Sequence, residues 1–168
     1  MSEEKVKVKV THLTKKFGDL LVLDDISFNV REGEFLCIVG PTGCGKTTFL
    51  NSLTKLYDIT AGEILVNGEP VDLKKHNIAY IFQEYSTFPW LKVEENIRYG
   101  LKLKKLPEDV IRERTDEVIR MVGLEEFRNY YPDQLSASML QRVVIARAFA
   151  VKPELLIMDE PYGQLDIS

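Results

Sequence analysis

The sequence predicts an α/β fold with a mainly parallel sheet, an antiparallel β layer on its N-terminal side and an α-helical insert. Three observations predict it. Apolar and polar residues alternate over 6–30, short apolar runs at 35–39, 77–82 and 155–158 are typical of buried strands, and a helical period runs from about 93 to 149. Strands and helices in this order favour one α/β core with a β-rich N-terminal layer.

Length and composition limit the classes of protein. A chain of 168 residues can bury one core, so 1–168 is predicted to be a single domain with a helical subdomain at about 86–150. The 22 basic and 26 acidic residues give a net charge of −4, which argues against nucleic acid as a partner. No run approaches the ~20 apolar residues that cross a bilayer, so a cytoplasmic protein is expected. Cys37 and Cys44 form no disulfide framework, and Cys37 is expected in a strand core.

The N-terminal β layer is predicted from its alternation. Residues 6–30 suggest short antiparallel strands joined by a polar turn at 15–19. The stretch 61–70 is predicted to be a further strand that closes with an Asn67-Gly68 turn, a pair that favours tight hairpins. The alternating apolar residues of the first stretch are Val6, Val8, Val10, Leu21, Leu23, Ile26, Phe28 and Val30.

The most specific signal is the glycine-rich loop after the predicted strand 35–39. Gly40, four further residues and then Gly45, Lys46 and Thr47 form the Walker A pattern of a phosphate loop. Backbone N–H groups of such a loop face the phosphates of a nucleotide, the lysine neutralises the β- and γ-phosphates, and the threonine hydroxyl can ligate Mg²⁺. The alternative is a glycine-rich turn that contains a lysine by chance. The expected ATP-binding residues are Gly40, Pro41, Thr42, Gly43, Cys44, Gly45, Lys46, Thr47 and Thr48.

Three helices are predicted together with their ends. The first follows the phosphate loop and presents its positive N-terminal dipole to an anion. The second begins at Pro107, where the missing N–H costs little, and stops near Gly123. Ser136 is expected to cap the third, which runs over 139–150. Their expected apolar faces are Leu50, Leu53 and Leu56, then Val110, Ile111, Val118, Ile119 and Val122, and then Leu140, Val144 and Ala148.

Polar residues follow two of the predicted strands. Asp159 and Glu160 come directly after the apolar run 155–158, which is a Walker B pattern. Asp159 is expected to hold Mg²⁺, mainly through water, and Glu160 to polarise the attacking water as a general base. Gln83 follows the run 77–82, and its amide can ligate Mg²⁺ and orient water. The alternative interpretation is a solvated charge, or a solvated glutamine, at the end of a strand.

Taken in order, these motifs resemble the ATP-binding subunit of an ABC transporter over nearly the whole chain. The loop and the acidic pair match the family's Walker motifs, and Gln83 matches its Q-loop. Phe17 falls where the family places an aromatic side chain that stacks on adenine; alternatively, it is a turn residue packed on the β layer. Residues 135–148 occupy the place of the signature motif and its helix, and 160–166 matches Walker B running into the D-loop, with Asp166 as its acid.

The resemblance implies a P-loop NTPase core that binds Mg-ATP and acts as a homodimer. Two subunits sandwich two ATP molecules, each held by the Walker motifs of one subunit and the signature of the other. Residues 84–100 are expected to contact transmembrane permease subunits, which work with an extracytoplasmic solute-binding protein, at the inner face of the cell membrane. The Phe-Pro-Trp-Leu segment at 88–91 resembles the nitrate, sulfonate and taurine importer branch. Alternatively, Pro89 and Trp90 form a local hydrophobic anchor.

The chain departs from the family pattern in two places. Ala137 and Ser138 stand where two glycines let backbone N–H groups approach the partner's γ-phosphate, so crowding is expected. Only 168 − 160 = 8 residues follow Glu160, so the family's last core strands and switch histidine are expected to be missing, as in a fragment or a truncation. Neither His12 nor His76 matches that histidine. The expected signature residues are Leu135, Ser136, Ala137, Ser138 and Met139.

Two functions follow from these motifs. The first is the ATP-binding subunit of an importer that hydrolyses Mg-ATP to drive uptake of a small solute such as nitrate, a sulfonate or taurine. The alternative is a truncated or degenerate nucleotide-binding module with little or no ATPase activity. A ribosome- or DNA-directed ABC protein would carry tandem cassettes or long insertions, and a P-loop kinase would need an acceptor-binding lid; the sequence indicates neither.

Overall fold

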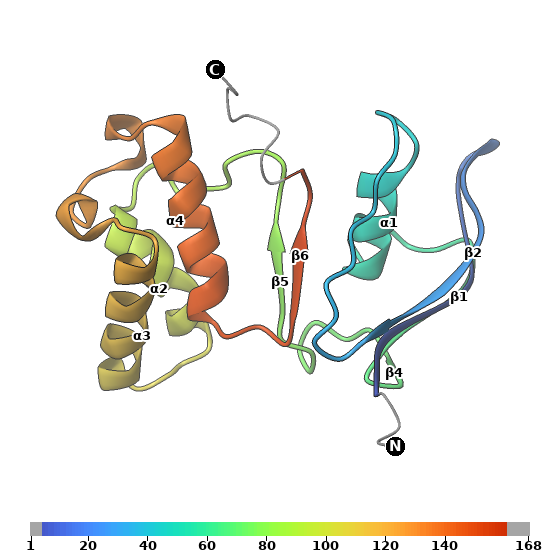
Figure 1. The fold of residues 1–168 in the computed structure, drawn as a ribbon, viewed down its shortest axis with the longest axis horizontal. Helices are drawn as coiled ribbons and strands as arrows, with labels where there is room; N and C mark the ends of the chain where they lie inside the picture. The colour runs from blue at the N-terminus through green and yellow to red at the C-terminus, as the bar shows by residue number, and fades with distance from the viewer. Residues whose placement is uncertain (1–4, 161–168) are drawn as a thin grey trace. The chain divides into compact units, whose positions relative to one another are not determined.

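The computed structural model describes residues 5–160 of the 168. The chain divides into two compact units, Met1–His76 and Asn77–Ser168. Within the described residues, the first contains an antiparallel sheet and one α-helix, and the second contains three α-helices, two short 3-10 helices and a pair of parallel strands (Figure 1). The predicted α/β class with an N-terminal antiparallel layer and a helical region is therefore confirmed.

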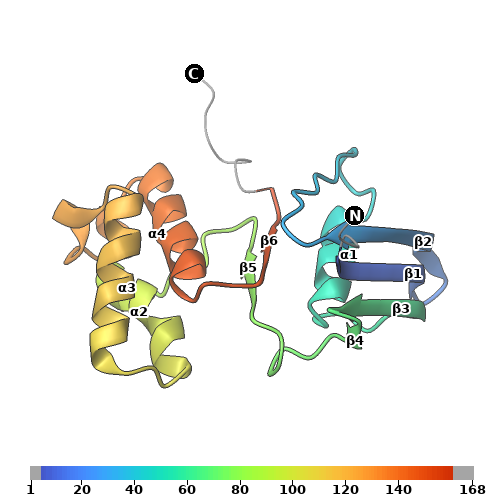
Figure 2. The ribbon, with the colours of Figure 1, turned by 60° about the horizontal axis from the view of Figure 1, so that its bottom comes forward.

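The sheet of the first unit has four strands in the order β2-β1-β3-β4 (Figure 2). Strands β1 (Val6–Phe17) and β2 (Leu20–Arg31) are 12 residues each and longer than the short strands expected. Strand β3 (Ala61–Val66) turns at Asn67-Gly68 into β4 (Glu69–Pro70), as predicted. Both turn residues have positive φ, 54° and 80°, which is the backbone conformation that the Asn-Gly pair favours.

Residues 35–39 form no strand among the described residues, so this prediction is wrong. Phe35 is 89% exposed, Val39 is 87% exposed and Cys37 is also exposed, although a buried strand core was expected. A parallel strand is stabilised by hydrogen bonds to its neighbours and by burial of both faces. No described strand pairs with residues 35–39, so their apolar character alone does not produce a strand.

Helix α1 (Lys46–Leu53) follows the glycine-rich loop, as predicted, but it is only eight residues long. Its buried residues are Phe49, Ser52 and Leu53. Leu56 was expected on the same apolar face, but it lies beyond the helix and is 54% exposed. The helix ends early because the backbone N–H groups of Thr54 and Lys55 bond back to the last turn and Lys55 then adopts a φ of 55°.

In the second unit, the parallel strands β5 (Ile78–Ile81) and β6 (Leu155–Met158) pair in register from Ile78 with Leu155 to Ile81 with Met158. Both strands were predicted. Helix α4 (Ala137–Ala150) packs Val144 and Ala148 against β5. These two residues lie on the face that the sequence indicated.

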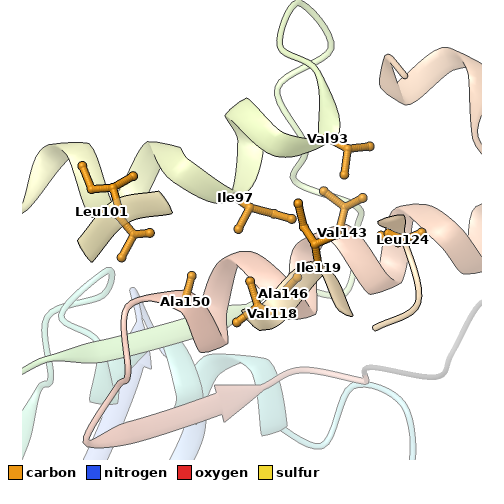
Figure 3. Close-up of a cluster of buried hydrophobic side chains, with 10 residues drawn as sticks. Val93, Ile97, Leu101, Val118, Ile119, Leu124, Val143, Ala146 and Ala150 are labelled. Atoms are coloured by element: carbon orange, nitrogen blue, oxygen red, sulfur yellow. The ribbon is translucent and has the colours of Figure 1, made fainter. Parts of the chain in front are cut away.

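The other face of α4 packs against α2 (Val93–Leu103) and α3 (Glu108–Met121), as Figure 3 shows. This second face was not predicted, because α4 is apolar on two sides and shows no single stripe. It completes the main cluster of buried side chains, which is Val93, Ile97, Leu101, Ile111, Val118, Ile119, Leu124, Val143, Ala146 and Ala150.

Ionic contacts tie the first turn of α2 to its surroundings. The guanidinium of Arg128 donates to Glu94 at 3.0 Å and to Asp116 at 2.8 Å. The backbone N–H groups of Val93 and Glu94 donate to the carbonyls of Tyr130 and Arg128. The hydrogen bonds to Glu94 and Asp116 raise the pKa of Arg128. The start of α2 is therefore fixed by the segment that follows α3.

None of the helices within residues 5–160 is long and apolar enough to cross a membrane.

Candidate nucleotide-binding site

The phosphate loop lies in the first unit and leads directly into α1. Gly43 and Gly45 adopt φ values of 81° and 100°, a region that L side chains rarely enter. A Cβ at Gly45 would lie 2.9 Å from Leu23 Cδ2 and 3.2 Å from the Val22 carbonyl, and one at Gly40 would lie 2.6 Å from Cys44 Sγ. Glycine is therefore required at position 45, whereas a Cβ at position 40 would meet only the end of the flexible Cys44 side chain.

The side chain of Lys46 folds back over this loop. Its ammonium donates to the carbonyls of Gly40 at 2.8 Å and Pro41 at 3.1 Å, and it lies 4.0 Å from Cys44 Sγ. The positive charge therefore lies at the loop that the sequence assigns to the phosphates.

The residues present fit a bound nucleotide phosphate. The N-cap of α1 is Gly45, no side chain caps this end, and no acidic residue lies in its first turn. The first N–H groups of a helix have no partner within the helix, so an anion can accept from them. Thr47 and Thr48 lie in the first turn of α1, and Thr42 lies in the loop, as expected.

Phe17 is the last residue of β1 and is 43% exposed. Its ring makes an edge contact with Tyr57 at a centroid distance of 5.4 Å, and the ammonium of Lys15 lies 4.6 Å from its centroid. The structure thus shows an exposed aromatic pair beside a turn. Such a pair can stack with a planar ring, but Tyr57 had not been singled out in the sequence.

The second unit brings together the polar residues that follow β5 and β6. The amide of Gln83 donates from Nε2 to Glu160 Oε2 at 3.0 Å, and the Tyr80 hydroxyl lies 3.4 Å from Asp159 Oδ2. Asp159 is buried, with 4% exposure, whereas Gln83 and Glu160 are exposed. Parallel strands deliver their ends to the same edge of a sheet, which explains why two residues 77 positions apart meet here.

The donor set at this edge fits Mg²⁺ only in combination with phosphate or water. Among residues 5–160, no group of three or more His, Cys, Asp and Glu side chains could hold a metal ion by itself. Mg²⁺ is commonly held by one or two carboxylates together with substrate phosphates and waters, and Asp159 can supply such a carboxylate. Thr47, the third expected metal ligand, lies in the first unit.

The signature residues lie at the start of α4. Ser136 is its N-cap, and its hydroxyl accepts from the backbone N–H of Met139 at 3.3 Å, as predicted. The same hydroxyl lies 3.1 Å from the hydroxyl of Ser138. Ala137 and Ser138 are exposed, and Leu135 packs against the helical cluster. The D-loop residue Asp166 lies outside the described residues.

The segment after Gln83 contains two contacts that the sequence analysis missed. Asn96 is fully buried and bonds to the backbone of the turn formed by residues 88–92. Arg147 of α4 donates to Ser86 Oγ at 2.8 Å and lies 5.2 Å from the ring centroid of Phe88. Burial lowers the pKa of Arg147. Asn96 could have been recognised in the sequence, because it is a polar residue between Val93 and Ile97 on an otherwise apolar helix face.

Comparisons with known proteins agree with this geometry. The family model described as ABC transporter matches residues 23–163. The sulfate/thiosulfate import ATP-binding protein CysA of Synechocystis sp. is 39% identical over 164 residues, which are 96% of this chain and 46% of that protein. The spermidine/putrescine import ATP-binding protein PotA of Bacteroides thetaiotaomicron is 41% identical over 170 residues, 99% of this chain and 37% of that protein. The chain thus spans less than half the length of these two relatives.

Two solved structures share the fold. The cbiO1 protein of Clostridium perfringens, part of the ABC transporter complex cbiONQ, has a TM-score of 0.87 and 30% identity, covering 98% of this chain and 68% of that chain. The ATP-binding cassette MJ0796, a dimer in a post-hydrolysis state bound to ADP and Pi, has a TM-score of 0.84 and 34% identity, covering 95% and 76%. With its phosphate loop and its matched family model, the chain belongs to the ATP-binding subunits of the ABC transporter family.

Proposed function

We propose that this chain is the ATP-binding subunit of an ABC importer, which binds Mg-ATP and hydrolyses it in a dimer to drive the uptake of a small solute. The observation that carries the proposal is the phosphate loop, where Lys46 and the uncapped start of α1 provide a cationic cradle that only glycine permits. ATP supplies the energy-rich phosphate bond. Gly40 to Thr48 would hold its phosphates, and Phe17 would contact its base.

The polar edge of β5 and β6 would supply the chemistry. Asp159 would be a ligand of Mg²⁺, and Glu160 would accept a proton from the attacking water. The amide of Gln83 donates a hydrogen bond to the Glu160 carboxylate and helps to orient it.

The partners are proposed from the same geometry. Ser136 to Met139 form an exposed helix start, and an exposed helix N-terminus can bind a phosphate held by a second subunit. Residues 84–100 include Trp90, which is 70% exposed and suited to contact a transmembrane permease subunit. The MJ0796 cassette is dimeric and cbiO1 belongs to a transporter complex, which support both contacts. An extracytoplasmic solute-binding protein would act indirectly, and the subunit would lie at the cytoplasmic face of the membrane.

The solute is proposed only as a small molecule. The two curated relatives above are named for import of sulfate or thiosulfate and of spermidine or putrescine, one group anionic and the other cationic. Neither belongs to the nitrate, sulfonate and taurine branch that the segment 88–91 resembles. A motif of four residues is weaker evidence than an alignment of the whole chain, so we assign no solute.

The test is to express the chain together with the membrane subunits encoded beside it and to purify the complex through a tag on this chain. We expect the membrane subunits to be retained, and Mg-ATP to be hydrolysed with release of phosphate. A complex that retains the membrane subunits but binds no nucleotide would contradict the proposal. A chain that binds ribosomes and leaves the membrane subunits behind would contradict it too.

A second candidate, a nucleotide-binding module without turnover, is favoured by the signature. Ala137 and Ser138 add side-chain atoms at the first two positions of α4, and the Ser136 hydroxyl is already engaged by Met139 and Ser138. The polar groups at the start of α4 therefore form hydrogen bonds with one another. Fewer donors are then left for the phosphate of a partner subunit.

Replacing both Ala137 and Ser138 by glycine should therefore speed phosphate release by the complex. We expect a rise of about tenfold, because one regained backbone contact in the transition state is worth roughly 1.4 kcal/mol. Ser138→Ala is the matched control, since it removes the hydroxyl but keeps Cβ, and its rate should stay at that of the unaltered protein. Equal rates in the double-glycine variant and the unaltered protein would show that the signature does not limit turnover.

A further inference from the structure

The turn formed by residues 88–92 carries an aromatic side chain that is largely exposed. Trp90 is 70% exposed, and its ring makes a tilted contact with Phe88 at 5.7 Å between ring centroids. Phe88 also contacts Tyr99 of α2, at 4.6 Å between centroids. These contacts leave most of the Trp90 side chain open to solvent.

The backbone of this turn is held by the side chain of Asn96. Its Oδ1 accepts from the Phe88 N–H at 2.7 Å. Its Nδ2 faces three carbonyls, those of Phe88 at 3.1 Å, Leu91 at 2.8 Å and Lys92 at 3.1 Å. Asn96 itself is 0% exposed, so no water competes for these bonds. One buried amide thus fixes both ends of the turn that carries Trp90.

A second support lies under the turn. The guanidinium of Arg147 stacks on the Phe88 ring at 5.2 Å and bonds to Ser86 at 2.8 Å. This contact places Phe88 from the side of α4, while Asn96 places its backbone from the side of α2. Phe88 is therefore held on two sides, and Trp90, two residues further on, is left exposed.

We propose that Asn96 is a positioning residue that fixes the turn 88–92 so that Trp90 projects as a preformed apolar anchor for the membrane subunit. The use of Trp90 as an anchor rests on the proposed function; the fixing of the turn does not. Preorganisation lowers the entropy lost on binding, because the anchor does not have to be ordered when the partner docks. A tryptophan that is already fixed in an exposed position therefore loses little conformational entropy when the membrane subunit binds.

Trp90 is the only tryptophan of the chain, so time-resolved fluorescence anisotropy reports on this turn alone. In the unaltered chain we expect Trp90 to depolarise with the tumbling of the whole molecule. Asn96→Ala should add a fast nanosecond component, which reports free motion of a loop. Asn96→Ser should add the same component. This variant is less prone to misfold than Asn96→Ala, because a serine hydroxyl can still bond to the carbonyl of Lys92 four residues earlier.

Ile97→Val is the matched control. Ile97 is the next residue of α2, is equally buried, and packs in the helical cluster rather than on the turn. This variant should lose stability without adding the fast component. The inference is overturned if both Asn96 variants keep the anisotropy decay of the unaltered chain, or if Ile97→Val gains the same fast component.

Retention of the membrane subunits separates this inference from the proposed function. We expect Trp90→Ala and Asn96→Ser both to reduce retention, while the affinity for Mg-ATP stays unchanged in each. If Trp90→Ala reduces retention and Asn96→Ser does not, the positioning role is overturned and the function stands. If neither reduces it while Asn96→Ser still frees Trp90, the docking contact is wrong and the fixed turn stands.

Discussion

Replacing Lys46 by alanine should raise the dissociation constant for Mg-ATP by about 100-fold or more. A hydrogen bond to a charged group contributes roughly 1.5–3 kcal/mol, and a loss of about 2.7 kcal/mol corresponds to a 100-fold change in affinity. In the structure, the ammonium of Lys46 already lies over the loop, bonded to the carbonyls of Gly40 and Pro41. The variant therefore removes the cation from the place where the phosphates are expected. Equilibrium titration with a fluorescent ATP analogue measures the change.

The matched control for this prediction is Lys9→Ala. Lys9 is an exposed lysine on β1, so the variant removes the same charge from the same unit without touching the loop. Its affinity for the nucleotide should equal that of the unaltered chain. Thermal unfolding without nucleotide should show that both variants keep the fold. An unchanged affinity in Lys46→Ala would mean that the phosphate loop is not the nucleotide site.

Replacing Glu160 by glutamine should leave nucleotide binding intact and slow phosphate release by about 100- to 10,000-fold, the usual contribution of a general base. The amide has the shape of the carboxylate but cannot accept the proton. Because Gln83 donates to Glu160 through an amide, the oxygen of a glutamine at position 160 can still accept that hydrogen bond, and the local structure should persist. Phosphate release by the complex with its membrane subunits, measured together with ATP affinity, gives both quantities.

Glu113→Gln provides the control for Glu160→Gln. Glu113 is exposed on α3, and its neutralisation changes the net charge by the same amount. Phosphate release in this variant should not change. If Glu160→Gln hydrolyses ATP at the rate of the unaltered complex, the base is a different residue. In that case the contact with Gln83 is only structural.

Local patterns predicted the elements whose stabilising contacts are close in sequence. The Asn67-Gly68 turn and the cap at Ser136 both lie where their residue types favour them, whereas the strand at 155–158, although predicted, also depends on its parallel partner β5. The prediction for residues 35–39 was wrong because a strand depends on neighbours that a local pattern does not contain. An apolar run is necessary for a buried parallel strand but does not by itself produce one.

The candidate site was predictable in its residues but not in all its contacts. Gln83 and Glu160 were singled out separately, and their meeting follows from the parallel pairing of β5 with β6. Asn96 and Arg147 were missed because a helical pattern does not specify their partners, which are the turn before α2 for Asn96 and Ser86, 61 positions earlier, for Arg147. A polar residue that replaces an apolar one within a buried stripe marks such a contact, but its partner is known only once the chain is folded.

Because Arg128 fixes the start of α2, it also affects how easily the neighbouring turn at residues 88–92 unfolds locally. The backbone of Glu94 bonds to Arg128, whose side chain reaches back to Glu94 and across to Asp116 on α3. Residues 88–92 are bonded to the same helix through Asn96. A surface turn usually opens locally at little free-energy cost, and its amide hydrogens exchange quickly. Because the turn is bonded to Asn96 in the first turn of α2, we expect the two to open together, within the cooperative unfolding unit of the helical cluster.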